Sequence, residues 1–238
     1  MRYNLRYAVV IGLVLSACTA ATATDDAIRI GYGQIPIDPG NYWIDHDRDP
    51  ATGLRVDFAV ADPDWGALIG ANKQAGENKQ AGENIGENYV AVKFFAIDRV
   101  ATAACDGTDY LPAGETAEAL AKQLASIKDF ETVEPLAKVT AFGHDGYHVV
   151  LAVPPTSWHI VGKFPVVGKF PDCDYGRFDS WSGPTFDRYY QGPGQIVEFW
   201  VLDVEGTLLS IEATWFPDSP AEDLAQLRKI IDSVLITP

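Results

Sequence analysis

The end of the chain, from Gln195 to Pro238, decides the fold: it reads QIVEFWVLDVEGTLLSIEATWFPDSPAEDLAQLRKIIDSVLITP. Val197 to Val204 is rich in β-branched and aromatic residues, and the following Glu205-Gly206 suits a tight two-residue turn. In Thr207 to Trp215 the odd-numbered positions are the apolar ones. This pattern predicts a β-hairpin, and it places the odd-numbered face of the second strand on the core.

A helix is predicted directly after the hairpin. Ser219 can cap it, Pro220 fits its first turn because a missing N–H does no harm there, and Glu222 stands three residues after the cap. Apolar residues at helical spacing then form a stripe that packs most simply against the hairpin. These residues are Leu224, Leu227, Ile230, Ile231 and Val234. Leu235 to Thr237 is a further candidate strand.

The start of the chain predicts export and lipid anchoring. Two arginines precede an apolar run, Ala8 to Ala17, that is too short to span a bilayer and is typical of a signal peptide. Leu15-Ser16-Ala17-Cys18 resembles the bacterial lipobox, in which the cysteine is lipidated and becomes the first residue after cleavage. We therefore expect a lipoprotein signal peptide over residues 1–17, lipid attachment at Cys18 and a flexible tether over residues 18–26. An ordinary secretory signal with a coincidental Cys18 is the alternative.

Charge and length limit the classes of function. The chain has 18 Lys and Arg against 33 Asp and Glu, which gives a formal net charge of −15. This acidity argues against nucleic acid as a partner and against attraction of the protein body to an anionic membrane, so membrane contact is expected through the lipid alone. Residues 27–238 are within the size range of a single domain.

Two cysteines remain once Cys18 is assigned to lipid. Cys105 and Cys173 belong to a chain that is predicted to reach an oxidising compartment, and there we expect them to pair. A bridge between them would close a long loop and contribute roughly 4 kcal/mol to stability in the chain-entropy model. Free or metal-bound thiols are the alternative.

The middle of the chain predicts more strands and one helix. Candidate strands cover residues 27–32, 54–60, 89–100, 137–142 and 147–153, with a turn at residues 143–146 between the last two. Thr116 to Ile127 has the apolar spacing of a helix, and Thr116 or Gly114 stands near its start. Helices set between hairpins indicate an α+β fold, a mostly antiparallel β-sheet with helices packed on it.

The segment from Trp158 to Tyr190 is rich in aromatic residues, but its Gly, Pro and Asp content prevents long regular elements. Its rings either cover the sheet or form an exposed ledge for a ligand. The candidate ledge residues are Trp158, Trp181, Tyr189 and Tyr190. We expect Trp181 to belong to the core. The two tyrosines are expected to stay at the surface, because their hydroxyls need water or a polar partner and a Gly-Pro turn follows them.

The sequence contains no motif for catalysis, a metal or a cofactor. There is no Gly-x-Ser-x-Gly, and the pair His144 and His148 is predicted to lie in an exposed turn without the helix and Glu that a zinc site of this spacing needs. Asp45, Asp47 and Asp49 begin like a calcium loop, but Pro50 stands where such a loop needs Gly. We therefore predict no catalytic residues, metal or cofactor.

Several motifs resemble a known family. Asp98-Arg-Val, the stretch from Gly143 to Pro154, and above all Gln191 to Gly206 (QGPGQIVEFWVLDVEG) are similar to an uncharacterised family of secreted actinobacterial proteins. That family is similar in turn to lipoproteins with the fold of the PsbP photosystem subunit. The resemblance covers residues 90–238, and it implies an α/β/α sandwich, a Cys105–Cys173 disulfide and no catalytic residues.

Together these patterns predict an extracytoplasmic protein that is anchored to the cell membrane by lipid. We expect a non-enzymatic module that binds a small apolar ligand or a partner protein. The alternative is a secreted hydrolase or metal-dependent enzyme whose site is assembled from His46, His144, His148 and the acidic loop at Asp45 to Asp49.

Overall fold

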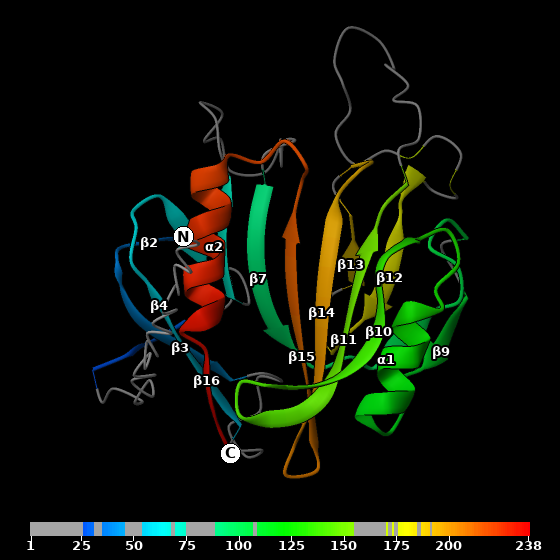
Figure 1. The fold of residues 1–238 in the computed structure, drawn as a ribbon, viewed down its shortest axis with the longest axis horizontal. Helices are drawn as coiled ribbons and strands as arrows, with labels where there is room; N and C mark the ends of the chain where they lie inside the picture. The colour runs from blue at the N-terminus through cyan, green and yellow to red at the C-terminus, as the bar shows by residue number, and fades with distance from the viewer. Residues whose placement is uncertain are drawn as a thin grey trace, which may run out of the picture.

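A computed structural model describes residues 26–30, 35–45, 54–67, 70–74, 89–106, 109–154, 170, 173, 176–184, 187–190 and 192–238. The predicted signal peptide, Cys18 and Trp158 lie outside these ranges, as does the side chain of Tyr189. The described residues form mostly antiparallel sheets and two helices, which confirms the α+β class (Figure 1). Neither of these helices is long and apolar enough to cross a membrane.

A broad antiparallel sheet forms the centre of the fold. Its strand order is β10-β11-β14-β15-β7-β6-β5-β2, so the predicted hairpin occupies the middle. The strands are β2 (Ile35–Ile37), β5 (Trp65–Ala67), β6 (Gly70–Gln74), β7 (Tyr89–Phe95), β10 (Glu131–Ala141), β11 (His144–Ala152), β14 (Ile196–Val204) and β15 (Thr207–Trp215).

Two smaller sheets lie beside the broad one. The β3–β4 sheet has the order β1-β3-β4-β16 and consists of β1 (Ile28–Arg29), β3 (Gly40–Asp45), β4 (Arg55–Val60) and β16 (Leu235–Thr237). The β12–β13 sheet has the order β13-β12-β8-β9 and consists of β8 (Arg99–Ala101), β9 (Tyr110–Pro112), β12 (Asp179–Ser182) and β13 (Asp187–Tyr189). The candidate strand at residues 89–100 is therefore divided between β7 and β8, which belong to different sheets.

The central hairpin has the predicted strands and the predicted turn. Glu205 and Gly206 have φ values of 53° and 89°, the backbone that a tight hairpin turn requires. The odd-numbered face of β15 lies on the core, as expected, and the even-numbered Ser210, Glu212 and Thr214 are buried as well. Because β15 lies between β14 and β7 in a sheet that is covered on both sides, its polar face has no access to water.

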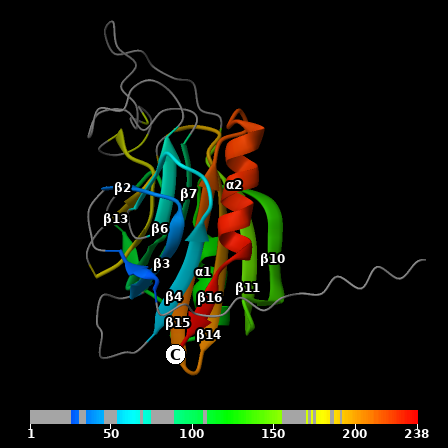
Figure 2. The same ribbon diagram turned by 90° about the vertical axis from the view of Figure 1, so that its left-hand side faces the viewer.

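The helix α2 (Ala221–Asp232) and the β3–β4 sheet cover one side of the broad sheet, which we call the α2 face (Figure 2). Arg228 of α2 reaches Glu198 of β14, and the rings of Phe58 in β4 and Phe94 in β7 lie 5.3 Å apart. The helix does not begin with the predicted cap. The Ser219 hydroxyl accepts from the Phe216 N–H instead, and the first helical bond runs to the carbonyl of Pro220.

The β12–β13 sheet and the helix α1 (Ala117–Ala125) cover the opposite side, which we call the β12 face. Trp181 of β12 stacks on Phe95 of β7 with ring centroids 3.9 Å apart. The helix α1 begins at a Thr116 cap, as predicted, and its Glu118 interacts with Tyr147 of β11. The broad sheet therefore has one helix on each face, and Figure 1 shows the two helices far apart across it.

The hairpin of β10 and β11 differs from its predicted form. The turn lies at Phe142-Gly143, with φ values of 54° and 83°, rather than at residues 143–146. Gly143 adopts this backbone easily, so the strands close there and continue further on both sides. As a result, His144 and His148 lie on β11 and not in an exposed turn.

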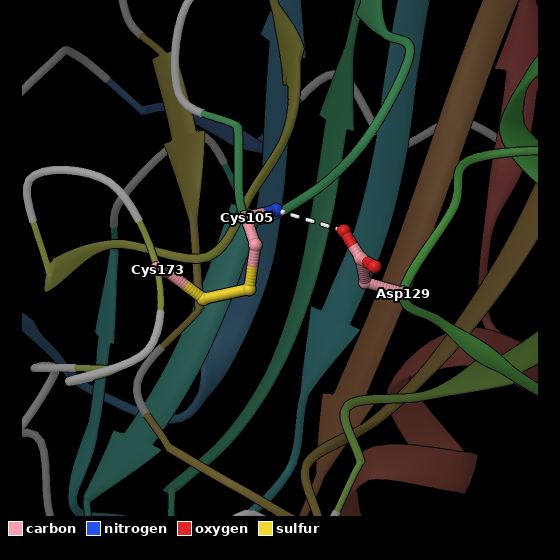
Figure 3. The surroundings of a disulfide bond; sticks show 3 residues. All are labelled: Cys105, Asp129 and Cys173. Atoms are coloured by element: carbon pink, nitrogen blue, oxygen red, sulfur yellow. Dashed lines mark hydrogen bonds between the residues drawn. A yellow bond between two sulfur atoms is a disulfide. The ribbon is translucent and has the colours of Figure 1, made fainter.

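A disulfide joins Cys105 and Cys173, 68 residues apart, as predicted (Figure 3). It ties the segment after β8 to the segment before β12. The Asp129 carboxylate accepts a hydrogen bond from the Cys105 N–H at 3.1 Å and so holds the same segment from the other side. Because β8 and β12 are neighbouring strands of the β12–β13 sheet, the bridge joins the segments at one end of that pair of strands.

Replacing Cys105 by serine (Cys105→Ser) is expected to lower the free energy of unfolding by about 2–5 kcal/mol, because the open chain regains loop entropy. Guanidinium unfolding followed by tryptophan fluorescence measures the change. Cys173→Ser removes the same bond and should give an equal loss. A wild-type protein whose stability is unchanged by reduction would contradict the prediction.

Candidate functional site

Two clusters of ionisable and aromatic side chains lie on opposite faces of the broad sheet. The interior cluster is on the β12 face and is closed to solvent. The second cluster is on the α2 face and is partly exposed. They are candidates for different roles because only the second is open to contact.

The interior cluster is built around Glu212, whose exposed fraction is 0%. Its Oε1 accepts from Lys93 Nζ at 2.9 Å and from Arg188 Nε at 2.7 Å, and its Oε2 accepts from Trp181 Nε1 at 3.2 Å. The side chains of Lys93 and Arg188 are also almost fully buried. One carboxylate therefore accepts hydrogen bonds from two buried cations and one indole.

The sheet architecture brings these residues together. Lys93 and Glu212 are direct cross-strand partners on β7 and β15, whereas Trp181 and Arg188 come from β12 and β13. Glu212 is thus the point at which the β12–β13 sheet is bonded to the broad sheet. Ser210 and Thr214 flank it on the same face and are buried as well.

Burial and charge act in opposite directions on this cluster. Burial raises the pKa of Glu212, but the charges of Arg188 and Lys93 outweigh it and hold the pKa below the ordinary value. Burial and the charge of Arg188 lower the pKa of Lys93 to about 8, and Glu212 offsets only part of this effect. Glu212 therefore stays ionised near neutral pH, and its lone pairs are committed to protein donors.

The aromatic segment is part of the core wherever the structure describes its rings. Trp181 and Tyr190 have exposed fractions of 0%. The guanidinium of Arg188 lies 4.3 Å from the centroid of the Tyr190 ring, and Phe130 meets that ring edge-on at 5.2 Å. Burial raises the pKa of Tyr190.

The expectation of a surface position for Tyr190 is therefore wrong, whereas the expectation that Trp181 belongs to the core is confirmed. The Arg188–Glu212 ion pair holds β13 against the broad sheet, and Tyr190, which follows β13, is therefore buried. Trp158 and the side chain of Tyr189 lie outside the described residues, so their place in a ledge is still a prediction.

The partly exposed cluster, which we call the Trp200 patch, lies on the α2 face. It consists of Phe142, His148, Glu198, Trp200, Trp215 and Arg228. His148 Nε2 is 2.9 Å from Glu198 Oε1, and Arg228 Nη1 donates to Glu198 Oε2 at 2.5 Å. Trp200 has an exposed fraction of 8%, and Trp215 and Phe142 are half-buried.

Strand register gathers the Trp200 patch from distant parts of the chain. His148 faces Trp200 across β11 and β14, with ring centroids 5.2 Å apart, and Phe142 meets Trp200 edge-on at 5.7 Å. Arg228 reaches over from α2 and covers Trp215 at 4.9 Å. Figure 1 shows β11 and β14, the strands that carry His148 and Trp200, side by side in the broad sheet.

Chemically, the Trp200 patch combines apolar ring area with one imidazole, one carboxylate and one guanidinium. Glu198 orients both His148 and Arg228, so the polar groups are held in place rather than free to rotate. Such an arrangement is suited to contact with a ring or an acyl group that also carries polar atoms.

The histidines do not converge. His144 and His148 share one face of β11 but are four residues apart, a separation of about 13 Å along a strand. Within the described ranges, no three His, Cys, Asp or Glu side chains come together in a way that could hold a metal ion. Asp45 forms an ion pair with Arg29, and His46, Asp47 and Asp49 lie outside the described residues.

Sequence reasoning missed Lys93, Arg188 and Glu212. Lys93 and Glu212 look like ordinary outward positions in alternating strands, yet each is the only charge within a β-branched and aromatic strand. The signal that could have identified Lys93 and Glu212 is a single charged residue in an otherwise uncharged strand that lies between two other strands of the sheet. Arg188 gives no comparable local signal, because it lies in the three-residue strand β13 next to another charged residue, Asp187.

Replacing Trp181 by alanine (Trp181→Ala) is expected to lower the free energy of unfolding by roughly 3–5 kcal/mol, because the change leaves a large cavity and removes an indole donor from Glu212. Chemical denaturation measures it. Trp43→Ala is the matched control: Trp43 is only half-buried, on β3, and its loss should cost about 1 kcal/mol. Equal and small losses in both variants would overturn the assignment of Trp181 to the core.

Alkaline pH should stabilise the wild type relative to Lys93→Met. The folded Lys93 has a pKa of about 8 and its ordinary value is 10.5, so the unfolded chain holds more protons between these limits. The stability difference between the two proteins is therefore expected to be level from pH 6 to about pH 8 and to rise from there towards pH 10.5 in favour of the wild type. Urea unfolding across this range measures it, with the exposed Lys122→Met as control. A difference that falls with rising pH would show that the ammonium form is the one that the fold prefers.

Comparison with known proteins adds no role for these residues. No family model matches the chain, and no curated protein matches it.

Proposed function

We propose that this protein is a lipid-anchored, extracytoplasmic lipoprotein of the cell envelope. Its folded domain acts as a non-enzymatic module that binds a small apolar ligand or a partner protein. The anchor is Cys18, and the contact surface is the Trp200 patch.

The observation that carries the proposal is the composition and exposure of the Trp200 patch. Phe142 and Trp215 are half-buried and so present part of their ring surface, Phe142 beside Trp200 and Trp215 under the Arg228 guanidinium. Aromatic side chains supply large contact areas at low cost in conformational entropy. Arg228 and His148 add polar contacts whose orientation is set by Glu198.

The state of the interior cluster favours binding over catalysis. Glu212 is sealed and already bonded to two cations and an indole, so it is not positioned to exchange a proton with a substrate. Among the residues that the structure describes, the His148–Glu198 pair has no hydroxyl or thiol as a hydrogen-bond partner. A general base needs such a nucleophile within reach to start covalent catalysis.

The resemblance to secreted actinobacterial proteins and to PsbP-like lipoproteins agrees with this proposal. It gives no catalytic residues, and it implies a sandwich with helices on both sides of an antiparallel sheet. The helices α1 and α2 on opposite faces of the broad sheet are compatible with that implication, and the disulfide suits an oxidising compartment.

The protein purified from its native membrane is expected to retain a small molecule or a partner chain, visible by native mass spectrometry. Trp215→Ala combined with Phe142→Ala removes the two half-buried rings of the Trp200 patch and should reduce the amount of retained ligand or partner at least several-fold. Trp43→Ala, which removes a half-buried indole from a different sheet, is the matched control and should keep it. Equal retention by all three proteins would place binding elsewhere.

A second arm of the experiment tests the anchor. Cys18→Ser should move the protein from the membrane fraction to the medium or leave it uncleaved. Membrane association that survives in a processed Cys18→Ser protein would contradict lipid anchoring at this residue. The two arms fail independently, because the Trp200 patch does not include the anchor.

A further inference from the structure

The strand β10 forms one edge of the broad sheet. Among the described strands it pairs only with β11, and it is eleven residues long. Its first half, Glu131–Pro135, is exposed, and Val133 has an exposed fraction of 52%. Long exposed edges offer unpaired backbone groups to another strand, so natural proteins usually protect them.

The side chains of β10 do not protect the edge in the usual way, because those of one copy of the strand are complementary to those of a second, antiparallel copy. If two copies of the strand run antiparallel with Leu136 opposite Leu136, then Glu134 faces Lys138, Val133 faces Val139 and Thr132 faces Thr140. Two-fold symmetry makes each of these pairs occur twice. Opposite charges, β-branched pairs and threonine pairs are the cross-strand contacts that stabilise antiparallel sheets.

The one residue that lacks an N–H fits the same register. Pro135 faces Ala137 in the paired strands, next to the two-fold axis. Residue pairs in antiparallel strands alternate between hydrogen-bonded and non-hydrogen-bonded positions. If Pro135 and Ala137 form a non-hydrogen-bonded pair, then Glu134 and Lys138 form a hydrogen-bonded pair. The register of β10 with β11 shifts twice in this stretch, between Thr132 and Glu134 and between Glu134 and Ala137, so its pairing with β11 is irregular on both sides of Glu134.

Charge at the edge does not oppose a second copy. A lone lysine or glutamate at an edge blocks pairing because it meets its own copy or an apolar residue. Here Glu134 and Lys138 are both exposed and stand two positions on either side of Leu136, so each meets its opposite. The helix α1 packs mainly on β11 and β14, one strand or more inside the edge.

We propose that a second copy of this chain pairs with β10, strand to antiparallel strand about a two-fold axis at Leu136, and continues the broad sheet across a homodimer. This contact is isologous, so every pair that forms once forms twice. The proposal does not depend on the Trp200 patch or on the lipid anchor. An extended segment of a different protein is the other occupant that such an edge could take.

Charge exchange provides the test, in the full chain carrying Cys18→Ser so that lipid does not cause association. Sedimentation velocity over a range of protein concentrations measures the monomer–dimer equilibrium. Glu134→Lys places lysines opposite each other twice, and Lys138→Glu does the same with glutamates. Each single variant is expected to self-associate about tenfold less tightly than the parent, or more weakly still.

Recombination of the charges should restore the contact. An equimolar mixture of the Glu134→Lys and Lys138→Glu proteins is expected to form heterodimers, and the double variant is expected to form homodimers like the parent. Glu205→Lys, at the turn of the central hairpin, makes the same charge change far from the edge and should leave the equilibrium unchanged. Near-ultraviolet circular dichroism verifies that each variant is folded.

Three results would overturn the proposal. They are a parent protein that stays monomeric over the whole concentration range, single variants that dimerise as tightly as the parent, and a mixture that remains monomeric although both of its components are folded. A parent that stays monomeric but captures an extended peptide at β10 would assign the edge to the other occupant and would likewise contradict a homodimer.

Discussion

The ion pairs of Glu212 are the constraint on which the arrangement of the sheets depends. A buried carboxylate costs several kcal/mol of desolvation unless it is matched by charge and hydrogen bonds, and Glu212 is matched only because two sheets meet. Lys93 comes from the broad sheet, and Arg188 comes from the β12–β13 sheet. If the two sheets separated, Glu212 would lose Arg188 and Trp181 together while remaining beside Lys93. The cluster therefore specifies one docking position for the small sheet, in the way that buried polar groups can fix register in other folds.

The sequence predicted the helices and strands of this fold better than it predicted which of their faces are buried. The hairpin Val197 to Trp215 and the cap at Thr116 depend on contacts within a few residues, so local rules were sufficient for them. The alternation in β15 identifies its apolar face, but no local pattern shows that a second sheet also covers the face that carries Glu212. Tyr190 was misplaced for the same reason, since no local pattern shows that Arg188 will pull β13 inward. The Phe142-Gly143 turn was missed by one or two residues, which is enough to move His144 from a turn to a strand.

The two clusters show how similar side chains acquire different roles through exposure. Glu212 and Glu198 each accept from two basic side chains and lie near tryptophan rings. The environment of Glu212 is closed on every side, so its charge contributes to the docking of two sheets. Glu198 has Arg228 at the surface and half-buried rings beside it, so its charge orients groups that a second molecule can touch. This contrast is the physical reason for placing recognition on the α2 face and architecture on the β12 face.

The position of β16 in the β3–β4 sheet has a consequence for the order in which the domain is assembled. β16 (Leu235–Thr237) pairs with β4 (Arg55–Val60), and β15 joins β14 to β7, so strands from the two ends of the chain complete one another. Strands that emerge first are left with open edges until residues 207–237 arrive, and such long-range pairings close slowly. In a chain made from its N-terminus, β4 and β7 therefore each lack one neighbouring strand until the hairpin of β14 and β15 and the segment of α2 and β16 have been made.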